Sequence, residues 1–154
     1  MSRTLPARRT ALLDREVGQA MSRLSAVAKK GLDDPALAEL VVIRASQLNH
    51  CAFCLDMHLG IARAHGVSEQ RLALLAAWEE AGDGVYDARE RAALALTEAV
   101  TELTEGFVPD AVYERAAMHF DDTRLAHLIG LIVAINNWNR VMVARRVPPG
   151  GYTP

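Results

Sequence analysis

Two cysteines and a histidine lie close together in the segment Cys51-Ala-Phe-Cys54-Leu-Asp-Met-His58. These are the only cysteines of the chain, and two residues separate them. A pair at this spacing can close and reopen as a disulfide, and such pairs commonly include a thiol of lowered pKa. A histidine one helical turn after Cys54 can accept or return a proton near neutral pH. The pattern predicts thiol redox chemistry.

On a helix, Cys51, Cys54 and His58 would share one edge, within an arc of about 60°. Cys54 and His58 would then lie one turn apart, close enough for the thiol and the imidazole to interact. The free N–H groups and the dipole at a helix N-terminus favour a thiolate at Cys51, whereas the histidine favours one at Cys54. The spacing alone leaves open which sulfur is the attacking one.

Two other interpretations of the cysteine pair stay open. Unpaired cysteines are among the most buried residues, so both could be packing residues, although the redox spacing disfavours this. The pair and His58 also supply three ligands of the types that zinc prefers. A closed zinc site would take its fourth ligand from one of the other histidines, which are His50, His65, His119 and His127.

Glu39 is a second candidate for chemistry, because it is the only acid between Pro35 and Leu55. Its helical neighbours at the third and fourth following positions are Val42 and Ile43, so it lies on an apolar face. An acid in such surroundings lowers stability unless it is paired or protonated, and such acids often have shifted pKa values and functional roles. The alternatives are a partly exposed glutamate or a partner for Arg44.

Composition excludes several classes of function. The 154 residues are 51% hydrophobic and 23% charged, as expected of a single globular domain. A formal net charge of −2 gives no general attraction to nucleic acid or anionic lipid, so we expect neither as a partner. The N-terminus has no secretory pattern, and the weakly charged stretch 125–138 is too short to cross a bilayer. We therefore expect a cytoplasmic protein, where a permanent cross-link is unusual.

The elements that must carry these residues are helices. The sequence predicts seven, at about residues 11–27, 34–48, 51–66, 68–82, 88–103, 109–120 and 121–145. We expect the first to end near Lys29-Lys30-Gly31, a basic turn followed by glycine. Helix starts are marked by Asp34 with Pro35, Ser68, the capping box Asp87 with Glu90, Pro109, and Asp121 or Asp122.

Strand signals are nearly absent. The one β-branched cluster, Val41-Val42-Ile43, lies inside a helical pattern. A thioredoxin-like domain needs βαβ units around its Cys-x-x-Cys, so that fold is excluded. We predict an all-α bundle of about six to seven helices, with the cysteine pair at the start of a central helix.

The pattern Glu39-x11-Cys51-x2-Cys54-x3-His58 resembles that of alkylhydroperoxidase D-like (AhpD-like) proteins in the carboxymuconolactone decarboxylase superfamily. The resemblance covers about residues 15–148 and implies one domain over residues 1–154. The flanking segments that share it are 44–49, 62–66, 72–78 and 135–140.

The resemblance implies a thiol-dependent peroxidase that needs no metal or flavin. By this analogy Cys54 attacks the peroxide and becomes a sulfenic acid, which Cys51 resolves as a disulfide. Glu39 and His58 would form the proton relay. The implied partners are a small-molecule peroxide and a thiol reductant such as a lipoylated protein or a peroxiredoxin. A homo-oligomer is also implied, often a trimer or hexamer, and the apolar segment 125–138 agrees with a shared interface.

The chain departs from the family pattern at two positions. Phe53 stands where better-studied peroxidases have a second histidine, and His50 stands where glycine is frequent. His50 could replace the lost histidine or cap the helix. Two alternatives to the peroxidase stay open: a thiol–disulfide carrier or redox sensor, and a zinc-stabilised oligomer. Decarboxylation is not expected, because the decarboxylases of the superfamily generally lack the cysteine pair.

Overall fold

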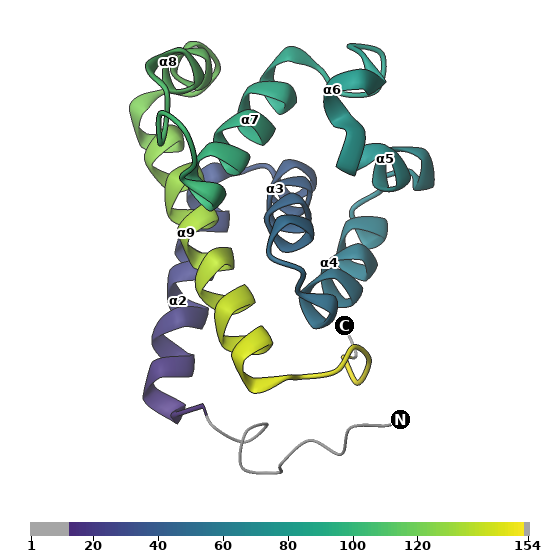
Figure 1. The fold of residues 1–154 in the computed structure, drawn as a ribbon, viewed down its shortest axis with the longest axis vertical. Helices are drawn as coiled ribbons and strands as arrows, with labels where there is room; N and C mark the ends of the chain where they lie inside the picture. The colour runs from purple at the N-terminus through teal and green to yellow at the C-terminus, as the bar shows by residue number, and fades with distance from the viewer. Residues whose placement is uncertain (1–12, 153–154) are drawn as a thin grey trace.

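A computed structural model describes residues 13–152, and this part of the chain is all-helical, without strands (Figure 1). The all-α prediction is therefore confirmed. The helices in chain order are α2 (Arg15–Leu32), α3 (Pro35–Leu48), α4 (Ala52–Ala64), α5 (Glu69–Leu74), the 3₁₀ helix η1 (Leu75–Ala77), α6 (Trp78–Ala81), α7 (Ala88–Glu102), α8 (Asp110–His119) and α9 (Asp122–Arg145).

Helix α3 lies at the centre and packs against α4, α7 and α9, while α2 runs along α9 on the other side (Figure 1). This position explains why α3 is apolar on nearly all sides: Leu40, Val41 and Ile43 are fully buried. Helices α5, α6 and α8 lie towards the end of the molecule opposite the C-terminal end of α9. The arrangement places α4, with the cysteine pair, against α3 and α9.

The predicted capping signals form as expected. The Asp34 side chain accepts a hydrogen bond from the Leu37 N–H, with Pro35 in the first helical position of α3. Asp87 and Glu90 form a reciprocal capping box at the start of α7. Other caps are Ser68 on α5, Asp121 on α9 and Asp14 on α2. These signals are local, so they form wherever the helix forms.

The first helix ends close to the predicted position, but Gly31 does not terminate it: α2 continues to Leu32 and ends at Asp33 in the left-handed conformation. Gly31 serves packing instead. A Cβ at this position would lie 2.0 Å from Cδ2 of His127 on α9, so any larger residue would have to displace the His127 ring. The predicted residues 11 and 12 lie outside the described part of the chain.

The predicted helix over residues 68–82 is interrupted by η1. Leu75 and Trp78 are both buried, and they lie three residues apart. A 3₁₀ turn has three residues per turn, so it directs both side chains to the same side, which an α-helix does less well. The interruption therefore lets this segment cover the core with both residues.

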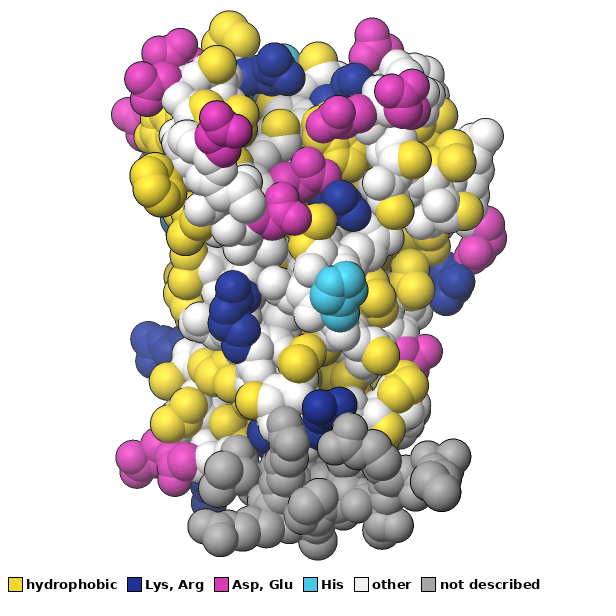
Figure 2. All heavy atoms as spheres, in the orientation of Figure 1, with side chains coloured by type: hydrophobic (Ala, Val, Ile, Leu, Met, Phe, Trp, Pro, Cys, Tyr) yellow, Lys and Arg dark blue, Asp and Glu magenta, His cyan; other side chains and the backbone are white. Residues whose placement is uncertain are grey.

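The molecule also leaves apolar surface open. Helix α9 buries Leu128, Leu131 and Ile132, yet Val133 remains 43% exposed, so the single chain does not cover every apolar side chain of this helix. Most acidic side chains visible in Figure 2 gather at the end where α6 and α8 lie.

Between residues 13 and 152, no helix is both long enough and apolar enough to cross a membrane.

Candidate active site

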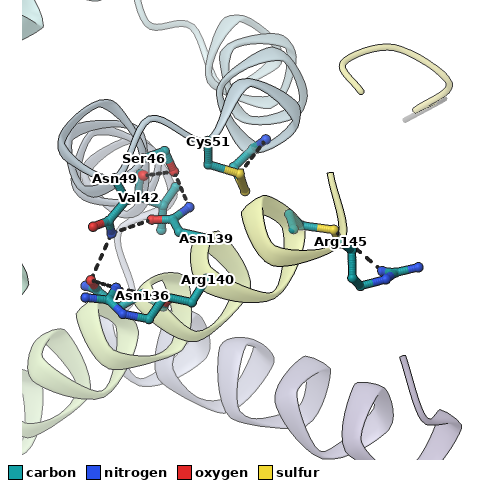
Figure 3. Close-up of a disulfide and its surroundings, with 10 residues drawn as sticks. Val42, Ser46, Asn49, Cys51, Asn136, Asn139, Arg140 and Arg145 are labelled. Carbon is teal, nitrogen blue, oxygen red and sulfur yellow. Dashed lines mark hydrogen bonds between the residues drawn. A yellow bond between two sulfur atoms is a disulfide. The ribbon is translucent and has the colours of Figure 1, made fainter. Parts of the chain in front are cut away.

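The two cysteines lie at the N-terminus of α4 and are joined in a disulfide (Figure 3). Cys51 is the N-cap residue, and its sulfur accepts a hydrogen bond from the Cys54 N–H at 3.3 Å. Cys54 follows in the first turn of the helix. Both cysteines are almost fully buried, since Cys51 is 1% exposed and Cys54 is 2% exposed. Both sulfurs are therefore reached only through cavities.

A tight turn between α3 and α4 fixes the position of Cys51. The Cys51 N–H donates to the Ser46 carbonyl at 3.0 Å, and the His50 N–H donates to the Gln47 carbonyl at 3.2 Å. This is a Schellman arrangement, in which glycine usually occupies the position held here by His50. His50 has a φ of 55°, in the left-handed region that disfavours a side chain by about 1–2 kcal/mol. The chain thus keeps a histidine beside Cys51 despite this strain.

Glu39 is buried and pairs with two basic side chains. Its Oε2 lies 2.7 Å from Nδ1 of His58, and its Oε1 lies 2.5 Å from Nζ of Lys29. Glu39 is 2% exposed and His58 is 7% exposed, whereas the Lys29 side chain is 34% exposed. The three residues come from α3, α4 and α2, so the pairing depends on how these helices pack. They form a chain of polar groups from the cysteine helix to the surface.

This pairing sets the charge of Glu39. Burial raises its pKa, but the hydrogen bond and the charge of His58, together with those of Lys29, outweigh burial and hold the pKa below its ordinary value. An ionised Glu39 accepts hydrogen bonds only, so Nδ1 of His58 carries the proton. In a neutral imidazole, Nε2 is then left as a proton acceptor.

Cys54 and His58 line one cavity of about 470 Å³ between α2, α3, α4 and α9. Its other walls are mostly apolar, from Phe53, Ile135 and Trp138 among others. A volume of this size suits a small organic molecule, with a few polar groups to orient it. An apolar molecule bound in this cavity would therefore lie beside Cys54 and the imidazole of His58.

A hydrogen-bond network built mainly of amides and a hydroxyl supports the other side of the disulfide (Figure 3). Nδ2 of Asn139 donates to Oγ of Ser46 at 2.9 Å, and Ser46 donates to the Val42 carbonyl at 2.7 Å. Nδ2 of Asn49 donates to Oδ1 of Asn136 and to Oδ1 of Asn139. Asn139 is fully buried. The network ties α9 to the turn that positions Cys51.

The structure brings together all four predicted site residues, which are Cys51, Cys54, His58 and Glu39. Both alternatives for Glu39 are wrong, because it is buried and because Arg44 donates to Glu98 at 2.7 Å instead. Within residues 13–152, no three His, Cys, Asp or Glu side chains are placed to hold a metal ion, which gives the zinc alternative no support.

Sequence reasoning missed Lys29 and the asparagine network. Lys29 is interpreted from sequence as part of a basic last turn, and no local signal distinguishes it from Lys30. The stretch Ile135-Asn-Asn-Trp138-Asn139 did carry a signal, because amides are unusual in so apolar a helix.

Comparison with known proteins identifies the family. The model of the carboxymuconolactone decarboxylase family matches residues 15–99, which include the whole Glu39-to-His58 site. The chain belongs to this family. A crystal structure of an Agrobacterium tumefaciens protein of unknown function, described as a candidate antioxidant defence protein AhpD, has the same fold. The TM-score is 0.83 at 34% sequence identity, covering 90% of this chain and 94% of the other.

Two bacterial proteins are similar to this chain in sequence. The uncharacterized protein YdfG of Bacillus subtilis is 44% identical over 106 residues, which are 69% of this chain and 71% of YdfG. The uncharacterized protein YnjA of Escherichia coli is 34% identical over 119 residues, which are 77% of this chain and 63% of YnjA. The expected resemblance to AhpD-like members of the superfamily is confirmed.

Proposed function

We propose that this protein is a thiol-dependent peroxidase that reduces organic hydroperoxides or hydrogen peroxide through a Cys51/Cys54 dithiol–disulfide cycle. The observation that carries the proposal is the buried pair of Glu39 and His58, 2.7 Å apart, with His58 in the same cavity as Cys54. Such a pair can hold and move a proton beside a sulfur. The description of the Agrobacterium relative as a candidate antioxidant defence protein agrees with this chemistry.

In the proposed cycle the Cys54 thiolate attacks the terminal oxygen of the peroxide. The O–O bond breaks, the sulfur becomes a sulfenic acid, and the leaving alkoxide takes a proton. We assign the transfer of this proton to His58. Its Nε2 takes the proton from the Cys54 thiol and later gives it to the alkoxide, while the hydrogen bond from Nδ1 to Glu39 holds the ring in place. The Cys51 thiolate then attacks the Cys54 sulfur, the S–O bond breaks, and the hydroxide leaves as water with the proton that the Cys51 thiol released, so that the disulfide forms. A thiol reductant returns the pair to the reduced state.

The cavity favours an organic hydroperoxide with an apolar group. Phe53 replaces the second histidine expected from better-studied peroxidases, and it contributes an apolar wall instead of a proton carrier. Lys29 extends the relay to the surface, because it is hydrogen-bonded to Glu39 and partly exposed. We therefore assign proton exchange with solvent to the path from His58 through Glu39 to Lys29.

The carrier or sensor alternative is less well supported by the geometry. A disulfide carrier needs a sulfur that a protein partner can reach, whereas Cys51 and Cys54 are almost fully buried. The absence of a second histidine at Phe53 is the observation in its favour. Consumption of an organic hydroperoxide with dithiothreitol as reductant separates the two functions, because a carrier would not turn over.

The test of the proposed function is the behaviour of two serine variants with one equivalent of an organic hydroperoxide. We expect Cys54→Ser to lose the fast reaction. Cys51→Ser should still react, but stop as a sulfenic acid that a dimedone probe captures. The wild type should form an intramolecular disulfide without covalent dimers on non-reducing electrophoresis. Fast oxidation of Cys54→Ser would contradict the assignment of the attacking sulfur.

We further propose that the chain assembles as a homo-oligomer, a trimer or hexamer, with the Cys54 cavity near a subunit contact. The support is the apolar surface left on the adjoining helices α2 and α9, where Val17, Val27 and Val133 are 43–52% exposed. Light scattering should give a mass of several subunits at micromolar concentration. A stable mass near 16.8 kDa would refute the assembly.

A further inference from the structure

We propose that the reductant reaches the disulfide through a second cavity, which opens on Cys51 and is built to receive a small thiol that carries a carboxylate. The proposal rests on the peroxidase cycle and names the substrate class of its second half. The second cavity has a volume of about 370 Å³ and is lined by His50, Cys51, Arg146 and Pro148 among others. Cys54 does not line it, just as Cys51 does not line the first cavity.

Residues after α9 form the outer wall of this second cavity. The chain turns at Arg146, which has a φ of 56°, and passes back over the start of α4. The Gly150 N–H donates to Oδ2 of Asp56 on α4 at 2.9 Å, which holds this tail in place. Phe53 and Met142 line both cavities and separate them. The disulfide therefore has a different cavity at each sulfur.

The stereochemistry of thiol–disulfide exchange decides which cavity the reductant uses. A thiolate attacks one sulfur in line with the S–S bond, and the other sulfur leaves. Attack on Cys51 needs space beside its sulfur, and the second cavity is lined by Cys51 and not by Cys54. The departing electron pair then goes to Cys54, in the cavity that holds His58. Attack at Cys51 thus regenerates the peroxide-reactive thiolate directly, with its proton relay already beside it.

The full exchange consumes two thiols. The first thiolate forms a bond to the Cys51 sulfur, the Cys51–Cys54 bond breaks, and Cys54 leaves as a thiolate. A second thiolate attacks the reductant sulfur of the mixed disulfide and releases Cys51 as a thiolate, which takes a proton from water. The protein disulfide gains two electrons, and the two thiols become one disulfide. The two thiol protons pass to water.

The charges at the second cavity select the reductant. Arg146 carries a permanent positive charge, and it forms no ion pair with another residue between 13 and 152. His50 offers an N–H donor beside it, in a backbone conformation where glycine would be less strained. Backbone outliers that persist often mark functional positions. A carboxylate on a short thiol could reach these groups while its sulfur contacts Cys51, and the 1% exposure of Cys51 excludes a bulky partner.

The test begins with protein oxidised by diamide, so that no peroxide reaction is involved. The rates of reduction by 3-mercaptopropionate and 2-mercaptoethanol are measured, each divided by the rate of the same thiol with a neutral model disulfide. We expect a preference of about 1.5- to 5-fold for the carboxylate thiol, the effect of one exposed ion pair. Arg146→Gln should abolish the preference. His50→Asn, which tolerates the left-handed backbone, should reduce it.

Arg115→Gln is the matched control, because Arg115 is an exposed cation on α8 and lines neither cavity. It should keep the preference. Alkylation during the reaction, followed by tandem mass spectrometry, should show the mixed disulfide on Cys51 and the alkyl group on Cys54. A mixed disulfide on Cys54, or equal preference in wild type and Arg146→Gln, would overturn the proposal. Failure of the peroxide assay would refute the peroxidase and leave these measurements valid.

Discussion

The two sides of the disulfide are built from different chemistry. On the Cys54 side, the buried pair of Glu39 and His58 joins the partly exposed Lys29 in a set of groups that can exchange protons. On the Cys51 side, amides and a hydroxyl connect α9 to the turn before α4, and none of these groups titrates near neutral pH. The Cys54 side therefore holds the paired proton-exchanging groups, while the hydrogen bonds on the Cys51 side fix the sulfur in place.

The comparison shows how the protein compensates for burying charged groups on one side and uncharged polar groups on the other. The charged side is stable because opposite charges and hydrogen bonds compensate for lost hydration, and its energy depends on pH. The neutral side is stable because each donor finds an acceptor, and its energy is independent of pH. Substitutions on the two sides should consequently separate into effects on rate and effects on stability.

The largest effect is expected from His58→Ala. Loss of the proton acceptor should lower the rate of Cys54 oxidation by about 10²- to 10⁴-fold, the usual contribution of a general acid–base group. It should also raise the pH at which alkylation of Cys54 reaches half its maximal rate. Stopped-flow measurements over a pH series test both. His119→Ala, at an exposed position on α8, is the control that should react normally.

A stability effect without a pH effect is expected from Asn139→Ala. The substitution removes the buried hydrogen bonds of Asn139 to Ser46 and Asn49, which keep only their bonds to Val42 and Asn136, and this should lower the free energy of unfolding by about 1–3 kcal/mol. Urea denaturation measures the loss. Thr97→Val on α7 removes a hydroxyl that bonds only its own helix, so it should cost less. A shifted pH profile of Cys54 alkylation in Asn139→Ala would break the proposed division between the two sides.

The smallest effect concerns acid stability. The pKa of Glu39 is lowered in the folded state, so Glu39 stabilises the fold above its ordinary pKa of 4.5, and this contribution is lost as the pH falls through the lowered value. Urea midpoints measured from pH 6 downward should therefore fall more steeply in the wild type than in Glu39→Gln. Lys29→Met should give an intermediate slope, because His58 remains. Parallel slopes in all three proteins would show that Glu39 is not ionised in the fold.

Local signals made most of the fold predictable. The pair Asp87 and Glu90 and the sequence Asp34-Pro35 each satisfy the N-terminus of one helix using residues next to it, so they act independently of packing. The packing role of Gly31 was not predictable, because it depends on contact with His127, which lies 96 positions later in the chain.

The candidate site was only partly predictable, because local signals reveal some of its residues and distant contacts bring in the others. Cys51, Cys54 and His58 lie on one helix, and the family pattern adds Glu39. Lys29 joins them through the packing of α2 against α3, and an exposed lysine gives no sign of its partner. Asn139 meets Ser46 across 93 positions, so its role could not be deduced from spacing. Contacts between distant segments are the part that one sequence does not reveal.

Gly31 also has a practical consequence for anyone who engineers this protein for heat resistance. Replacing a glycine within a helix by alanine is a standard route to a higher melting temperature, since alanine restricts the unfolded chain. At this position the new methyl group would collide with the His127 ring and disturb the contact between α2 and α9. Lys29 lies two residues before the point of collision, so such a variant would be expected to lose both thermal tolerance and catalytic rate.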